Sequence, residues 1–115
     1  MKYLICLAAL LWAEKLWSGL HFEDMQASAA RWVDIIRKKE NPDVLIGLFH
    51  AGKSGNVLGS VVEDPSMDIA QKVPGFDIVL IGHDHARACT KVADIKGDSV
   101  LIIDPASNAN VVSDV

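Results

Sequence analysis

The sequence predicts an α/β fold with a mixed sheet, and three features of the pattern support this prediction. Residues 22–40 carry apolar side chains at helical spacing along one face. Residues 44–49 and 77–82 are short, continuous apolar runs, typical of strands buried on both faces of a sheet. Two later apolar segments flank Lys96-Gly97-Asp98, which is a hairpin turn signal. The order of elements therefore indicates a sheet that becomes mixed or antiparallel towards the C-terminus.

The helix over residues 22–40 has acidic residues at its start and basic residues near its end, as the helix dipole favours. Asn41-Pro42 is expected to end it. Its apolar face is predicted to pack in the core. The residues of that face are Met25, Ala29, Trp32, Val33 and Ile36.

The remaining elements follow from turn signals. The loop over residues 50–65 exceeds the usual connection length, which indicates a functional or mobile segment. A short helix is expected to run from about Pro65 to Val73, followed by Pro74-Gly75. Three strands are then predicted, over residues 90–95, 99–104 and 111–115.

The size and charge of the chain exclude some classes of protein. Its 115 residues fit one domain and leave no room for two. The formal net charge is -4, without a long basic run, which argues against binding a nucleic-acid strand but not against a small phosphorylated ligand. Cys6 and Cys89 are too few and too far apart for a disulfide framework.

We expect the chain to divide into an apolar N-terminal segment, residues 1–12, and a domain over residues 13–115. The apolar run of the first segment is shorter than the roughly 20 residues that span a membrane, so no stable membrane span is expected. With Lys2 it resembles the start of a signal peptide, although a suitable cleavage site is lacking. A strand or helix of the domain, or a displaced chain start, remains the alternative.

Three histidines follow the predicted buried strands. His50 comes directly after residues 44–49, and His83 and His85 come just after residues 77–82. Ligand sites in open α/β sheets form beyond the carboxyl ends of the strands, so two neighbouring parallel strands would bring these rings together. Residues two apart in an extended segment project to the same side, which would let His83 and His85 face one metal. Imidazole binds zinc, iron and other divalent transition metals.

Other residues near the histidines have both a functional and an ordinary interpretation. Asp84 could orient an imidazole or lie in a solvated turn. Gly82 would leave room for a tight turn or for a metal-bound phosphate. Gly52 could do the same, but its interpretation as an ordinary loop glycine is preferred. Cys89 is more typical of a packed thiol than of a zinc ligand. His21 is interpreted as structural.

The two histidine segments resemble motifs of a known family. The segments Leu48-Phe49-His50-Ala51-Gly52 and Gly82-His83-Asp84-His85, the latter preceded by Val73-Pro74-Gly75-Phe76-Asp77, resemble the last two motif blocks of calcineurin-like metallophosphoesterases. The bacterial 5'-nucleotidase and 2',3'-cyclic-nucleotide phosphodiesterase branch is the most similar. His83 follows His50 by 33 residues, and this paired arrangement is more specific than either block alone.

The resemblance implies a four-layer α/β/β/α sandwich around two divalent metal ions, of which this chain would form half. It implies that His50 and His83 bind one metal and that His85 binds the other. Manganese, iron and zinc all suit such ligands. The implied substrate is a nucleotide or a similar phosphate ester, and the branch is often exported to the periplasm.

The family's earlier blocks, Asp-x-His, Gly-Asp and Gly-Asn-His, do not occur in their expected places. The bridging carboxylate and the acid–base histidine are therefore missing, and the sequence identifies no catalytic residue. We expect a nucleotidase-like hydrolase fragment with little activity alone. The missing N-terminal half, or a second copy of the chain, is its expected partner. The alternative is a non-catalytic metal-binding or interaction module.

Overall fold

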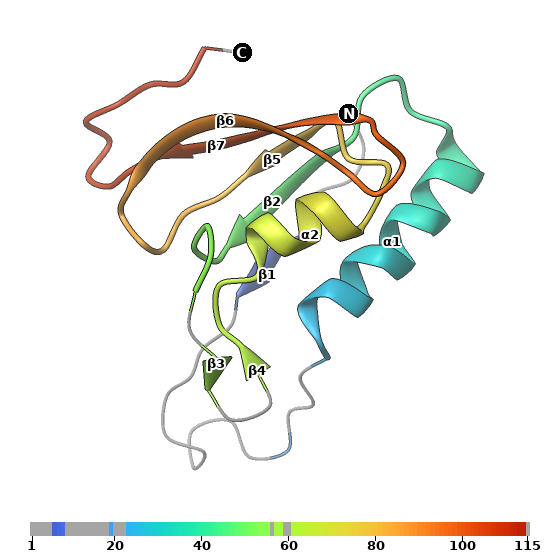
Figure 1. Ribbon diagram of the computed structural model, residues 1–115, viewed down its shortest axis with the longest axis horizontal. Helices are drawn as coiled ribbons and strands as arrows, with labels where there is room; N and C mark the ends of the chain where they lie inside the picture. The colour runs from blue at the N-terminus through green and yellow to red at the C-terminus, as the bar shows by residue number, and fades with distance from the viewer. Residues whose placement is uncertain (1–5, 9–18, 20–22, 56, 59–60, 115) are drawn as a thin grey trace.

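The computed structural model describes residues 6–8, 19, 23–55, 57–58 and 61–114. Within these residues a five-stranded sheet is built from β1 (Cys6–Ala8), β2 (Ile46–His50), β5 (Ile78–Leu80), β6 (Arg87–Ala93) and β7 (Ser99–Pro105). The strand order is β1-β2-β5-β7-β6 (Figure 1). Neighbouring strands are parallel except for β6, which pairs antiparallel with β7. The predicted mixed sheet is therefore confirmed, with its antiparallel pair at the C-terminal end.

Two helices and a small hairpin complete the described part of the chain. Helix α1 spans Met25–Glu40 and α2 spans Ser66–Lys72, while β3 (Val57–Leu58) pairs antiparallel with β4 (Val61–Val62). The α1 N-terminus is capped by Asp24, whose Oδ1 accepts a 2.8 Å hydrogen bond from the Ala27 amide. Asn41 ends α1 in a left-handed conformation at φ 42°. The hairpin lies within the long loop that connects β2 to α2.

Both helices contribute to one hydrophobic core on one face of the sheet (Figure 1). Alternate residues of the central strands enter this core, among them Phe49, Val79 and Ile102. Because side chains alternate across a strand, the residues between them face the other side. Those residues are only half-buried: Ile46, Leu48, Ile78, Leu80 and Leu101. The prediction that the first two strands are buried on both faces is therefore wrong, since both helices cover the same face.

Trp32 does not pack as the helical pattern predicted. The other apolar residues of that face are buried, whereas Trp32 is 44% exposed. The Arg31 guanidinium carbon lies 5.9 Å from the centroid of its ring. Tryptophan is large and is seldom fully buried, and Ala29 and Ser28 fill the adjacent positions of the core face with much smaller side chains. Trp12 and Trp17 lie outside the described residues.

The two ends of the chain differ from expectation in different ways. Residues 6–8 form β1, which matches the strand alternative for the apolar N-terminal segment. The rest of residues 1–12, like His21, lies outside the described residues. The final strand predicted over residues 111–115 is absent from residues 111–114. Positive φ angles at Ala106, Asn108 and Ala109 turn the chain repeatedly before that point, so residues 111–114 do not form a further strand of the sheet.

Arg37 connects the end of α1 to the segment that leads into β5 through hydrogen bonds. Its guanidinium donates two hydrogen bonds to the Gly75 carbonyl, at 2.9 and 2.6 Å, one to the Pro42 carbonyl and one to Asp77 Oδ2. The Leu45 amide donates to the same Asp77 oxygen at 2.7 Å. Gly75 itself has φ 114°, a conformation that side-chain-bearing residues rarely adopt.

We expect Arg37→Ala to lower the free energy of unfolding by about 1–2 kcal/mol, because it leaves a partly buried carbonyl and carboxylate without their charged donor. Urea unfolding followed by far-ultraviolet circular dichroism measures the loss. Lys38→Ala is the matched control, since Lys38 is exposed and pairs with the exposed Asp34 carboxylate, an ion pair worth about 0.5 kcal/mol or less. Equal losses in both variants would contradict the assigned role.

Candidate functional site at the carboxyl ends of two parallel strands

His50 and His83 meet where β2 and β5 end. His50 is the last residue of β2, and Leu48 pairs with Leu80 in the parallel register between the two strands. The chain leaves β5 at Leu80 and reaches His83 three residues later. The two imidazole rings pack edge to face, with centroids 5.4 Å apart and planes at 73°. Parallel pairing therefore brings together two of the predicted site residues, as the sequence indicated.

The segment that carries His83 and His85 is not extended, contrary to the prediction. His83 has φ 88° and His85 has φ 56°, so both residues lie in the left-handed region. This conformation costs a residue with a side chain roughly 1–2 kcal/mol. The expectation that His83 and His85 project to the same side, as residues two apart in an extended segment do, is therefore wrong. Within the described residues, no ring contact joins His85 to His50 or His83. Backbone strain of this kind is common at functional sites.

Glu63 is a neighbour of the histidines that the sequence did not reveal. It lies just after the β3–β4 hairpin, and its Oε1 is 3.7 Å from His83 Nε2. The Glu63 side chain is 25% exposed and the His83 side chain is 41% exposed, so the pair sits at the surface. A lone glutamate in a long loop has no distinguishing spacing. Only the path of the hairpin places it beside the histidine segment.

Asp84 links the two histidine segments through the backbone, and within the described residues its hydrogen bonds go to backbone amides and not to an imidazole. Its Oδ2 accepts a 3.0 Å hydrogen bond from the Lys53 amide, and its Oδ1 accepts a 3.3 Å bond from the Ala86 amide. Gly52 also has a specific environment, because a Cβ added there would lie 2.7 Å from Asp64 Oδ1. At Gly82 an added Cβ would meet no atom within 4 Å, so the described structure gives no steric reason for a glycine there.

A second carboxyl group, that of Asp104, lies behind Asp84. Asp104 is 2% exposed, and its Oδ1 accepts a hydrogen bond from the Ala106 amide while Oδ2 has no hydrogen-bond partner among the described residues. Burial, followed by interaction with the neighbouring Asp84 carboxyl group, raises the pKa of Asp104. Burial also opposes ionisation of Asp84, but hydrogen bonds from the Lys53 and Ala86 amides, together with interaction with the Asp104 carboxyl group, outweigh it and lower the pKa of Asp84. A proton held on the buried Asp104 beside an ionised Asp84 accounts for both directions.

The described residues do not by themselves form a complete metal site. No group of three or more His, Cys, Asp or Glu side chains converges within the described part of the chain. Divalent transition metals bound by proteins take three or four protein ligands in most sites, and a two-metal centre also needs a bridging group. His50 and His83 supply two neighbouring imidazoles, which is part of such a set. We therefore derive no catalytic step through a metal held by this chain alone.

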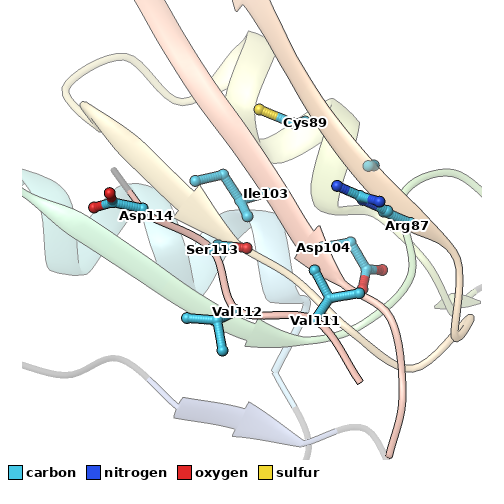
Figure 2. Close-up of a pocket in the computed structure, with 9 residues that line it drawn as sticks. Arg87, Cys89, Ile103, Asp104, Val111, Val112, Ser113 and Asp114 are labelled. Atoms are coloured by element: carbon cyan, nitrogen blue, oxygen red, sulfur yellow. The ribbon is translucent and has the colours of Figure 1, made fainter. Parts of the chain in front are cut away.

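The exposed thiol of Cys89 lies apart from the histidine pair. It lines a shallow pocket of about 180 Å³ between the β6–β7 strands and the C-terminal segment 111–114. Figure 2 shows Arg87, Cys89, Ile103 and Asp104 on the two strands, with Val111 to Asp114 passing beside them. None of the three histidines lines this pocket. The described structure therefore gives no support for Cys89 as a ligand beside His85.

Curated proteins and solved structures resemble the chain. It is 31% identical over 93 residues to the 2',3'-cyclic-nucleotide 2'-phosphodiesterase/3'-nucleotidase of Salmonella typhimurium, which covers 79% of this chain and 14% of the relative. The protein of the same name from Yersinia enterocolitica is 30% identical over 79 residues, covering 68% and 12%. The calcineurin-like phosphoesterase YfkN from Bacillus subtilis is 26% identical with a TM-score of 0.55, covering 74% of this chain and 28% of that one. No family model matches the sequence.

A mixed α/β sheet with histidines at the carboxyl ends of adjacent strands, together with these relatives, defines the class: the chain belongs to the calcineurin-like metallophosphoesterase superfamily. Within it, the curated relatives place the chain in the branch of the cyclic-nucleotide phosphodiesterases and nucleotidases. The chain spans about one seventh of the length of the Salmonella relative.

Proposed function

We propose that this chain is the histidine-bearing part of a nucleotidase-like phosphoester hydrolase, with little hydrolytic activity on its own. The observation that supports this proposal most directly is the contact between His50 and His83 at the ends of β2 and β5. The names of the two curated relatives support a nucleotide or cyclic nucleotide as the substrate class. In the proposal, His50, His83 and His85 contribute ligands to a divalent metal centre. Further ligands, a carboxylate bridge among them, come from outside the described residues.

The described arrangement also supports a proposal for how much metal the chain binds alone. Two adjacent imidazoles, with the Glu63 carboxylate near one of them, offer at most one incomplete site. Both imidazoles are neutral when they bind a metal, so two cations held together would lack the negative charge that a bridging carboxylate provides. The proposal therefore includes weak binding of a single divalent ion.

We expect isothermal titration of the full chain with Zn²⁺ or Mn²⁺ to give at most one ion per chain. In the same preparations, hydrolysis of 2',3'-cyclic AMP and 3'-AMP should not exceed the rate of a His50→Ala, His83→Ala double variant. Lys91→Ala, at an exposed position of β6, is the matched control and should leave metal binding unchanged. Two ions per chain with clear phosphoesterase turnover would contradict the proposal. Metal binding that survives loss of both histidines would contradict the assigned ligands.

The proposed location is outside the cytoplasm, by analogy with the branch. No helix in the described residues is long and apolar enough to cross a membrane.

A further inference from the structure

The loop that follows His50 is held by groups that come from two other parts of the chain. The Gly52 amide donates a 2.6 Å hydrogen bond to Asp64 Oδ1, and the Lys53 amide donates to Asp84 Oδ2. The Ser66 hydroxyl donates to the Ala51 carbonyl at 3.1 Å. Residues 51–53 are therefore fixed on both sides, immediately after the histidine.

Asp64 makes the closest approach to this loop. A Cβ at Gly52 would lie 2.7 Å from Asp64 Oδ1 and 3.1 Å from Asp84 Oδ2, and a Cβ at Gly55 would lie 2.6 Å from Asp64 Cβ. Cβ atoms essentially never come within 3.0 Å of another heavy atom, so an alanine at either position would force the Asp64 side chain to shift. Neither glycine has a positive φ, which makes the requirement one of space and not of backbone conformation.

The loop is also joined to α2, the helix that follows Asp64. The Met67 amide donates a 2.8 Å hydrogen bond to the Lys53 carbonyl, and Ser66 is fully buried. Ile69 and Ala70 of the same helix lie in the hydrophobic core. The position of Asp64 is consequently set by a packed helix, and the loop takes its position from that helix.

We propose that Asp64 is a positioning residue for His50: its carboxylate fixes the turn at Gly52 and so holds the His50 ring against the His83 ring. The biological meaning of this inference rests on the proposed function. The contact itself is a property of the metal-free chain. Asp64 acts on the turn by accepting the hydrogen bond from the Gly52 amide. It is not itself part of the contact between the two histidine rings. Its effect on the site is therefore transmitted through the backbone of residues 50–52.

The test measures the metal-free chain by nuclear magnetic resonance. Asp64→Ala should accelerate amide hydrogen exchange at Gly52 at least tenfold and remove the cross-relaxation between the His50 and His83 rings. Amides of α1 and β7 should keep their protection. Asp64→Asn retains an acceptor oxygen and should restore both signals. Asp68→Ala is the matched control, because Asp68 lies on α2 and forms an exposed ion pair with Lys72.

A second substitution reaches the same contact without touching Asp64. Gly55→Ala, at an exposed loop position, crowds the Asp64 carboxylate and should therefore accelerate amide exchange at Gly52. This variant provides a test even if Asp64→Ala fails to fold. Ser54→Ala is its control and should leave amide exchange at Gly52 unchanged. Gly52 protection and ring contact unchanged in Asp64→Ala, or in Gly55→Ala, would overturn the proposal. Equal loss in Asp64→Asn and Asp64→Ala would overturn the assignment to this hydrogen bond. Because no measurement uses metal or substrate, these outcomes are independent of whether the chain hydrolyses phosphoesters.

Discussion

Phe49→Ala is expected to lower the free energy of unfolding by about 3–5 kcal/mol, the range measured when large aromatic side chains are removed from cores. Phe49 is 1% exposed and packs edge to face on Phe76, with ring centroids 5.8 Å apart. A Cβ at Gly47 would lie 2.9 Å from the Phe49 ring, so the ring fills its space tightly. Little room for collapse remains around the cavity that alanine would create.

Urea unfolding followed by circular dichroism measures this effect. Ile95→Ala is the control, since Ile95 is 70% exposed and its truncation should change stability by less than about 0.5 kcal/mol. A loss below about 1.5 kcal/mol in Phe49→Ala would contradict the packing described here. Because Phe49 directly precedes His50, the substitution should also weaken the contact between the His50 and His83 rings. Phe49→Leu, which preserves more volume, should lose less stability.

Asp104→Asn is expected to stabilise the protein at neutral pH by about 1–3 kcal/mol, the usual cost of an unsatisfied buried polar group. The pKa of Asp104 is raised in the folded chain by burial and by the neighbouring Asp84 carboxyl group. Folding therefore favours the protonated form, and this contribution is fully present below the ordinary pKa of 3.8. It is lost as the pH rises through the raised folded value. An asparagine at this position carries no charge at any pH, so it avoids this loss.

Thermal unfolding of the wild type and of Asp104→Asn at pH 4 and pH 7.5 tests this sign. The variant should gain stability over the wild type mainly at pH 7.5. Asp84 acts in the opposite direction: its lowered pKa adds stability above 3.8 that is lost as the pH falls through its folded value. Asp98→Asn makes the same change at an exposed turn residue and should show no such pH-dependent gain. A variant less stable than the wild type at pH 7.5 would contradict the burial penalty assigned to the ionised Asp104 carboxylate.

Most of the elements were predictable because they depend on local patterns. The long helix, the short helix after Pro65 and the hairpin around Gly97 follow from spacing, capping and turn residues, and all three are present. Burial was less predictable. The apolar runs at Ile46–His50 and Ile78–Leu80 look alike on both faces in the sequence, but helices cover only one face of the described sheet.

The sequence by itself determined that histidines follow two buried strands, and parallel pairing made their meeting a consequence of sheet geometry. It could not determine the left-handed backbone at His83 and His85, between which Asp84 accepts a hydrogen bond from the Lys53 amide, 31 residues away. Nor could it reveal the roles of Asp64, Glu63 and Asp104. These side chains act through distances to residues remote in the chain, and carboxylates in loops carry no periodic signal. Tertiary structure alone decided which carboxylates face the histidine loops, because packing of α2 and the path of β7 place them there.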